Sequence, residues 1–485
     1  MNATSSARWL VGLLAIIFIS EIAWAGSLAL VAGRRDPRVI VIDVERALNP
    51  ANNGTANAVV ARVRVTPDVD TNGDGIPDSP ASGLPSNIVV APDGRTAFAV
   101  NHAGNATQAT VNVFQHGHLG TVAVIDIGNA LKPANNNTTN ALSAIIPTGF
   151  WGPVGLGLSP NGKFALVANS EGQGKEDGAR EISVIDLRKE VATETALLAL
   201  GNGGQVAQEP GKSCAALATD PALRPMAIPH PNFGCFPASN ALGVVRRRGG
   251  FAFTANGGTD DVSVIDIDRA IEGHPGAEVA RIPVERGPWG LAVSPNQRYV
   301  AVTNRESAET GVEGNTISLL DARRAIDGKP GAEVARVRVG TVDPVVPTRP
   351  FGLSFTPNGR RIVVANFRTN DVSVVDVQQA LANGVNGGSA AEVARIPLTK
   401  PGGGPARPRG VAVTSDGRYA VVSGGAAAAG LALGGNGAFC EQVTAVENCG
   451  ALWVIDLRSN TVAATVTGVG NEPYLVDIAP DRRRH

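Results

Sequence analysis

The sequence predicts an all-β fold, a seven-bladed β-propeller of four-stranded antiparallel blades, on three observations. Short apolar runs rich in Val, Ile, Ala and Thr alternate with turns, and the chain holds 58 Gly and 32 Pro in 485 residues. A strand that ends in Asp recurs seven times. The two ends of this array carry complementary parts of one unit. Radial repetition of small antiparallel sheets is typical of propellers.

The third strand of each unit gives the count of blades. It reads "VIVID", "VAVID", "ISVID", "VSVID", "ISLLD", "VSVVD" and "LWVID" in chain order. Its last residue is Asp43, Asp126, Asp186, Asp266, Asp321, Asp376 and Asp456. Because Asp side chains accept hydrogen bonds from nearby backbone N–H groups, these residues are predicted to cap a turn rather than to act in catalysis.

The second strand of each unit ends in a residue that is always Asn or Gly. These terminators are Gly33, Asn101, Asn169, Asn256, Asn304, Asn366 and Gly424. Because Asn and Gly adopt a left-handed backbone at the least cost, the pattern predicts a sharp turn at each position and a structural role.

The first strand, as in "PWGLAVSPN" and "PFGLSFTPN", is closed by a hairpin turn, and the fourth reads "AEVARIPV" or a variant of it. Two departures stand out: "VVRRRGG" at 244–250 replaces the turn sequence of the fourth unit, and Gln297 replaces the turn glycine of the fifth. The array starts in a second strand, "LALVAG", and stops after a lone first strand, "PYLVDIAP". The last strand is therefore expected to complete blade 1, which is split between 26–66 and 471–485.

Residues 1–25 have the features of a secretory signal peptide. Arg8 precedes the apolar run "WLVGLLAIIFIS", and the small-residue motif "AWA" ends at Ala25. We expect cleavage before Gly26, a single propeller domain over 26–485, and a periplasmic or secreted protein. No later run approaches ~20 apolar residues, so no membrane span is expected in the mature chain.

Charge and cysteine content narrow the classes of partner and cofactor. The net charge of −1 indicates no basic face for nucleic acid. In an oxidising compartment the even cysteine count predicts two disulfides between sequence neighbours, Cys214 with Cys235 and Cys440 with Cys449. The haem-attachment motif C-x-x-C-H does not occur in the sequence.

The combined pattern P-x-G-[LV]-x-x-[ST]-P-[DN]-G-[RK], V-A-N and V-S-V-I-D resembles the YVTN-type β-propeller repeat family. This family belongs to a superfamily that is similar to methylamine dehydrogenase heavy chains. The resemblance covers essentially all of residues 26–485 and implies a propeller fold and export. It implies no single activity, because one fold supports many functions.

The loops between strands two and three and between strands four and one must share one face, because neighbouring strands are antiparallel. That face receives the loops at 102–121 and 69–79, both cysteine-bearing insertions and the Pro-rich "GTVDPVVPTRP". Long loops on a rigid scaffold usually carry binding, so the loop-rich face is the predicted functional face; the alternative is that the loops merely cover the ring.

Counting back fifteen residues from each terminator identifies the residue that enters strand one beside the channel. The positions are Ser86, Val154, Ala241, Trp289, Phe351 and Arg409, with Tyr474 aligned by its "PYL". One arc, Trp289, Phe351, Arg409 and Tyr474, is predicted to bind a planar or anionic ligand, or a partner side chain; the alternative is that these rings plug the channel. The ring contains no carboxylate or histidine, which argues against a metal-dependent lactonase.

Two loops carry candidate metal ligands. "DVDTNGDGIPD" resembles the calcium loops of EF-hand-like and thrombospondin type 3 repeats, and it predicts a structural Ca²⁺ although Ala81 stands where a bidentate Glu would follow. Its ligands would be Asp70, Asn72, Asp74, the Ile76 carbonyl and Asp78. The alternative is a loop whose Asp, Asn and Gly only favour turns. A weaker candidate site for copper or zinc comprises His102, His116, His118 and His230, which otherwise are solvated loop histidines.

No P-loop, G-x-S-x-G or H-E-x-x-H motif occurs. The first hypothesis is therefore a non-enzymatic, exported binding or scaffold propeller that presents its loop-rich face to a protein partner or a small ligand. The second is a periplasmic enzyme or oxidoreductase subunit, whose partner would be a cytochrome or a cofactor-bearing small subunit, or whose histidines would hold a redox metal.

Overall fold

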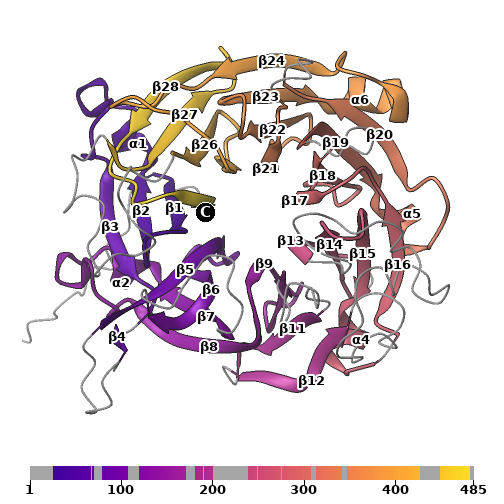
Figure 1. Ribbon diagram of the computed structural model, residues 1–485, viewed down its shortest axis with the longest axis horizontal. Coiled ribbons are helices and arrows are strands. Elements are labelled where there is room, and N and C mark those ends of the chain that lie inside the picture. Colours follow the sequence, from indigo (N-terminus) through magenta and orange to yellow (C-terminus); the bar gives the residue numbers. More distant parts are fainter. Residues whose placement is uncertain are drawn as a thin grey trace, which may run out of the picture.

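The computed structural model forms a ring of seven antiparallel sheets, which confirms the predicted seven-bladed β-propeller (Figure 1). It describes residues 26–66, 68–69, 79–107, 119–170, 181–188, 191–199, 239–247, 249–274, 276–306, 313–340, 347–425 and 448–480. In each blade the first strand lies nearest the channel, and the second, third and fourth follow outward.

The strands of the first three blades, from the channel outward, are as follows. Blade 1 comprises β29 (Pro473–Ala479), β1 (Leu28–Gly33), β2 (Arg38–Asp43) and β3 (Val59–Arg64). Blade 2 comprises β5 (Ser79–Val90), β6 (Thr96–Thr107), β7 (Leu119–Asp126) and β8 (Leu142–Trp151), with the short β4 (Asp68–Val69) beside β5. Blade 3 comprises β9 (Pro153–Leu158), β10 (Phe164–Asn169), β11 (Glu181–Asp186) and β12 (Val191–Ala199).

The other four blades repeat the same order. Blade 4 comprises β13 (Ser239–Val245), β14 (Phe251–Asn256), β15 (Asp261–Asp266) and β16 (Glu278–Pro283). Blade 5 comprises β17 (Pro288–Val293), β18 (Tyr299–Glu306), β19 (Glu313–Asp321) and β20 (Glu333–Arg338). Blade 6 comprises β21 (Pro350–Phe355), β22 (Arg361–Asn366), β23 (Asp371–Asp376) and β24 (Glu392–Pro397). Blade 7 comprises β25 (Gly410–Val413), β26 (Tyr419–Gly424), β27 (Ala451–Asp456) and β28 (Thr461–Val466).

The last strand closes the ring as predicted. β29 pairs antiparallel with β1, with Leu30 opposite Asp477 and Gly33 opposite Pro473. Residues from the two ends of the described chain therefore build one blade, and β1 is not left unpaired on its inner side.

All seven third-strand aspartates cap the turn that follows them, as predicted. Five of them begin the short helices α1 (Val44–Ala47), α2 (Ile127–Ala130), α4 (Ile267–Ile271), α5 (Ala322–Ile326) and α6 (Val377–Asn383). The carboxylates of these five accept from a backbone N–H at 2.8–3.1 Å, which is typical of helix N-caps. Asp186 and Asp456 accept from the N–H of Arg188 and Arg458 in the same way, at 3.0 and 2.8 Å.

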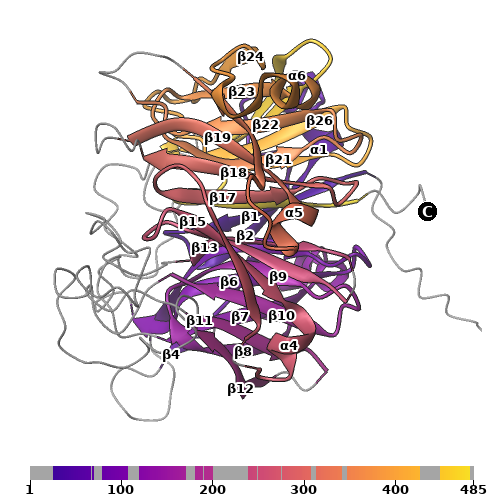
Figure 2. The same ribbon diagram turned by 90° about the vertical axis from the view of Figure 1, so that its right-hand side faces the viewer.

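The short helices lie on one side of the ring (Figure 2). They follow strand three, so they mark the face opposite to the loop-rich one. Three short 3-10 turns, η1 (Pro50–Asn52), η2 (Pro133–Asn135) and η5 (Gly384–Asn386), belong to the same connections. Among the described residues no helix is long and apolar enough to cross a membrane.

The second-strand terminators have a structural role, but the left-handed backbone predicted for them was wrong. None of the seven has a positive φ. The five asparagines are fully buried, and each donates its amide to a hydroxyl on the third strand, at 2.7–3.1 Å. A Cβ on Gly424 would lie 2.8 Å from the Arg407 carbonyl, so close backbone approach explains the glycine there.

The hydrophobic core is divided among the seams between neighbouring blades. Val39 and Val41 of β2, for example, pack with Ala123 and Ile125 of β7 in one buried cluster. Because both faces of each sheet are buried against another blade, the strands are apolar on both sides, and the exposed surface is limited to the outer strands and the loops.

Candidate functional site

The first strands bring one residue per blade to the channel in a common register. Each Pro of the "P-x" motif lies opposite a terminator, in the pairs Pro85 and Asn101, Pro153 and Asn169, Pro288 and Asn304, Pro350 and Asn366, and Pro473 and Gly33. The residue after each of these prolines is therefore equivalent: Ser86, Val154, Trp289, Phe351 and Tyr474. Arg409 has the same place in blade 7, because its N–H donates to the carbonyl of Ser423.

One predicted channel position was wrong. In blade 4 Ser239 lies opposite Asn256, so Asn240 has the register of Trp289 and Ala241 lies one residue further along the strand. The turn "VVRRRGG" is one residue longer than the corresponding turn of blade 5, and a fixed count from the terminator cannot allow for this.

The glycine of the "P-x-G" motif lets the first strands of neighbouring blades approach each other closely beside the channel. A Cβ on Gly290 would lie 2.1 Å from the Phe351 carbonyl oxygen, and a Cβ on Gly352 would lie 2.2 Å from that of Arg409. Only glycine fits there without displacing backbone. The residues after the prolines are consequently brought into contact from blade to blade.

The aromatic residues of blades 5, 6 and 1 form one cluster. The ring centroids of Trp289 and Phe351 lie 5.3 Å apart, and those of Phe351 and Tyr474 lie 5.3 Å apart at 83°. A fourth ring, that of Phe367 directly after β22, lies 6.0 Å from Phe351. These distances are typical of favourable tilted and edge-to-face aromatic pairs.

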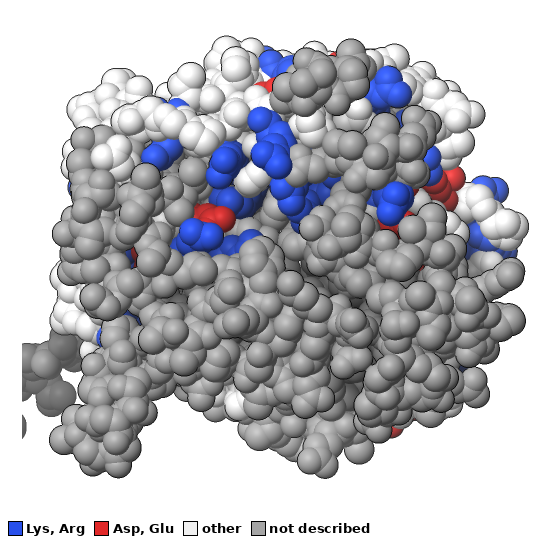
Figure 3. All heavy atoms as spheres, in the orientation of Figure 1, with Lys and Arg blue, Asp and Glu red and all other residues white. Residues whose placement is uncertain are grey.

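Five arginines surround these rings. The guanidinium carbon of Arg305 lies 4.2 Å from the Trp289 centroid, and that of Arg34 lies 4.9 Å from the Tyr474 centroid. Arg409, Arg349 and Arg407 lie 4.9, 5.3 and 5.8 Å from the centroid of Phe367. We call these five arginines, with Trp289, Phe351, Phe367 and Tyr474, the arginine–aromatic cluster. In Figure 3, which shows the loop-rich face, Lys and Arg side chains gather around the middle.

One backbone hydrogen bond, repeated in blade after blade, positions the cluster. The residue after each terminator donates its N–H to the carbonyl of the residue before the proline: Arg305 to Gly287 at 3.0 Å, Phe367 to Arg349 at 3.1 Å, and Arg34 to Glu472 at 3.1 Å. Sequence reasoning missed Arg34, Arg305, Arg349, Arg407 and Phe367. The available signal was their position directly beside a terminator or a proline.

Glu472 neutralises part of the cluster. Its carboxylate forms ion pairs of 2.6 Å with Arg409 and with Arg35. The Arg409 side chain is only 5 % exposed, and it also donates to the carbonyl of Gly425 at 3.2 Å. Burial lowers the pKa of Arg409 to about 10; Glu472 and Tyr474 oppose this shift, whereas the positive charges of Arg34 and Arg407 add to it.

The structure places the predicted binding arc together but leaves the metal predictions untested. His102 is half-buried at the loop-rich end of β6, whereas His116, His118 and His230 lie outside the described residues. The calcium-loop residues Asp70, Asn72, Asp74, Ile76 and Asp78 also lie outside them, so both metal sites stay predictions. Within the described part of the chain, no group of three His, Cys, Asp or Glu could hold a metal ion.

Cys449 is buried and disulfide-bonded. Cys214, Cys235 and Cys440 lie outside the described residues, and both predicted pairings stay predictions.

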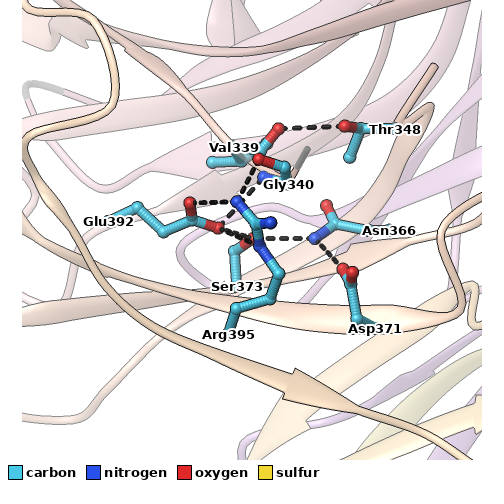
Figure 4. Close-up of polar contacts among 8 residues, drawn as sticks. All are labelled: Val339, Gly340, Thr348, Asn366, Asp371, Ser373, Glu392 and Arg395. Atoms are coloured by element: carbon cyan, nitrogen blue, oxygen red, sulfur yellow. Dashed lines mark hydrogen bonds and ion pairs between the residues drawn. The ribbon is translucent and has the colours of Figure 1, made fainter. Parts of the chain in front are cut away.

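A second polar region lies further from the channel and repeats in several blades. In blade 6 Asn366 donates to Asp371 at 2.6 Å and to Ser373 at 2.7 Å, and Ser373 donates to Glu392 at 2.5 Å (Figure 4). Arg395 is ion-paired with Glu392 at 2.8 Å. The equivalent residues of blade 4 are Asn256, Asp261, Ser263, Glu278 and Arg281. This network links strands two, three and four of one blade, so its role is structural.

The opposite end of the channel contains a cavity of about 510 Å³ between blades 1 to 4. Apart from Arg246 and Asp477, its lining residues are Val, Leu, Ile, Ala, Pro and Gly. The Asp477 carboxylate accepts from the N–H groups of Val90 and Ile478, both at 2.8 Å, and burial raises its pKa to about 6. Because Val90 belongs to blade 2, this carboxylate links the closing strand to the next blade.

No protein-family model and no curated protein matches the sequence. Solved structures do match the fold. A periplasmic gluconolactonase, PpgL, of Pseudomonas aeruginosa aligns with a TM-score of 0.55 at 16% identity, over 93% of this chain and 98% of that one. A putative 6-phosphogluconolactonase of Bacteroides uniformis aligns with a TM-score of 0.54 at 14% identity, over 93% and 99%. At such identities the likeness shows the propeller fold alone.

Proposed function

We propose that this protein is an exported binding propeller that holds an anionic ligand, or an anionic group of a protein partner, at the arginine–aromatic cluster. The observation that carries the proposal is the convergence of Arg349, Arg407 and Arg409 on the single ring of Phe367, within 5.8 Å of its centroid. Signal-peptide features in residues 1–25 support export.

Concentrated positive charge and fixed side-chain orientation both favour anion binding at the cluster. Guanidinium groups brought so close repel one another. The ion pair of Glu472 with Arg409 offsets part of this repulsion, and a bound anion would offset more of it. Aromatic faces hold guanidinium groups in fixed orientations. Less conformational entropy is then lost when the guanidinium N–H groups bind an oxyanion. A rigid ring of blades keeps the four contributing blades in place, so the site is preorganised.

The enzyme alternative differs in what it requires. Both similar structures named above carry lactonase names. A lactonase would need a group that activates water near the ligand, and an oxidoreductase subunit would need a redox centre there. The cluster supplies positive charge and planar surfaces, which favours binding over catalysis.

Isothermal titration of the mature protein with phenyl phosphate, isophthalate and benzoate tests the proposal, with benzylamine and glucose as cationic and neutral controls. We expect the anions to bind and the controls not to bind, and we expect affinity to fall as NaCl rises. Arg305→Gln should weaken anion binding about tenfold or more, since each charge-assisted contact is worth roughly 1.5–3 kcal/mol. Absence of anion binding would refute the proposal, and turnover of a lactone or an ester probe in the same samples would favour the enzyme alternative.

A further inference from the structure

The residue before the first-strand proline has a left-handed backbone in five blades. In blades 3 and 5 it is Gly152 and Gly287, with φ of 58° and 63°. In blades 6, 7 and 1 it is Arg349, Arg407 and Glu472, with φ of 51°, 40° and 56°. Glycine adopts this conformation without steric cost, whereas a side chain with a Cβ is strained by it. Three consecutive blades therefore hold a charged residue in a conformation for which the fold itself favours glycine.

Glu472 and the two arginines differ in what their side chains approach. Glu472 ion-pairs with Arg35 and Arg409 and so offsets the burial of Arg409. The guanidinium groups of Arg349 and Arg407 instead approach the Phe367 ring, to which Arg409 already contributes a positive charge. Both arginines bring a positive charge to one ring from a strained backbone, and strained residues of this kind cluster at ligand sites.

We propose that Arg349 and Arg407 are the specificity-determining residues of the cluster, and that together with Phe367 they bind a doubly charged oxyanion on a planar ligand, namely a phosphate monoester or an aromatic dicarboxylate. Two planar guanidinium forks match the oxygen atoms of such a group, and the Phe367 ring beside them offers a surface for the planar part. This inference rests on the proposed function and names the ligand class of the same site.

Glycine substitution tests the inference, because it removes the charge and the backbone strain together. For Arg407→Gly and Arg349→Gly we expect a melting temperature equal to or above that of the wild type. We expect the affinity for phenyl phosphate and isophthalate to fall about tenfold or more in each variant. Benzoate, with one charge, should lose less. A difference between phenyl phosphate and isophthalate in the wild type distinguishes the phosphate from the dicarboxylate.

Gln297→Gly is the matched control. Gln297 also has a left-handed backbone, with φ of 59°, at a turn where the equivalent Gly162, Gly359 and Gly417 have φ of 67–69°. It lies at the opposite end of the first strand, so its replacement should leave anion affinity unchanged. Arg407→Lys keeps the positive charge but lacks the planar, bidentate guanidinium group, so it should lose part of the affinity for phenyl phosphate and isophthalate.

Three outcomes would overturn the inference. Retained affinity in both glycine variants, with affinity lost in Arg305→Gln, would move the oxyanion elsewhere in the cluster and leave the proposed function intact. A lower melting temperature in both glycine variants would show that the arginines are held for stability. Wild-type protein that binds none of the three anions would refute the proposed function itself.

Discussion

The outer polar network keeps nearly the same side chains in several blades, whereas the channel mouth, formed by the residues after the first-strand prolines, has different side chains in each blade. In blades 4, 5 and 6 the network keeps Asn, Ser, Glu and Arg at equivalent positions, with Thr316 in place of Asp in blade 5. At the mouth, equivalent positions hold Ser86, Val154, Trp289, Phe351, Arg409 and Tyr474.

The difference separates what the fold requires from what it permits. The network residues satisfy buried polar atoms that every blade of this kind contains, so the same solution recurs. The mouth residues meet a backbone that is the same in each blade, yet their side chains differ in size and charge. Variation against a constant backbone shows that the fold permits different side chains at these positions.

The largest expected effect comes from removing the strand that serves both regions. Deletion of residues 473–485 removes β29, which closes blade 1 and carries Tyr474 of the cluster. We expect a sharp fall in melting temperature, together with loss of anion binding, because β1 is left with an unpaired inner edge. An unchanged melting curve would show that the ring does not depend on this closure.

A smaller effect should separate the network from the mouth. Asn366→Ala leaves Asp371 and Ser373 without their shared donor, and it should lower the free energy of unfolding by about 1–3 kcal/mol. Chemical denaturation measures this loss. The affinity for phenyl phosphate should stay within error of the wild type. Loss of affinity at unchanged stability would show that the network belongs to the binding site.

A further expected effect is a dependence of stability on pH. Burial raises the pKa of Asp261 and of Asp477 to about 6 and raises that of Asp371. The folded state then binds more protons than the unfolded state between about pH 4, the ordinary range of an aspartate pKa, and pH 6. Stability should therefore fall as the pH rises through this window and level off above it.

Melting temperatures measured from pH 4 to pH 8 test this expectation, with Asp261→Asn as the comparison. The amide introduced by this substitution cannot ionise, so the variant should show a shallower decline than the wild type across the same window. Parallel curves for the two proteins would mean that Asp261 ionises equally well in the folded and unfolded states.

Much of the architecture could be predicted from the sequence because propeller blades are built from local contacts. Strand, turn and strand lie within a few tens of residues, and the recurring Asp revealed both the number of blades and its own capping role. The asparagine terminators were recognised as structural for the wrong reason: their amides donate to a buried hydroxyl, and their backbone stays extended.

The candidate site could be predicted only in part. A fixed count found Trp289, Phe351 and Arg409, and the motif "PYL" placed Tyr474. The count failed at Ala241, where the turn is one residue longer. Phe367 and the arginines around it were missed, because the count placed only the residue after each proline and not the residue before it or the one after each terminator.

By itself, the sequence determined the four-stranded blade, the number of blades and the closure of the ring. The reason is that the order of apolar strands and turn residues specifies pairing between strands that are close in the sequence. Only the tertiary structure decided which residues meet at the mouth. Arg34 donates to the Tyr474 hydroxyl at 3.4 Å across a separation of 440 residues, and Glu472 joins arginines from two blades. Such contacts depend on the curvature that closes seven blades into a ring, which is a property of how the sheets pack and not of any one repeat.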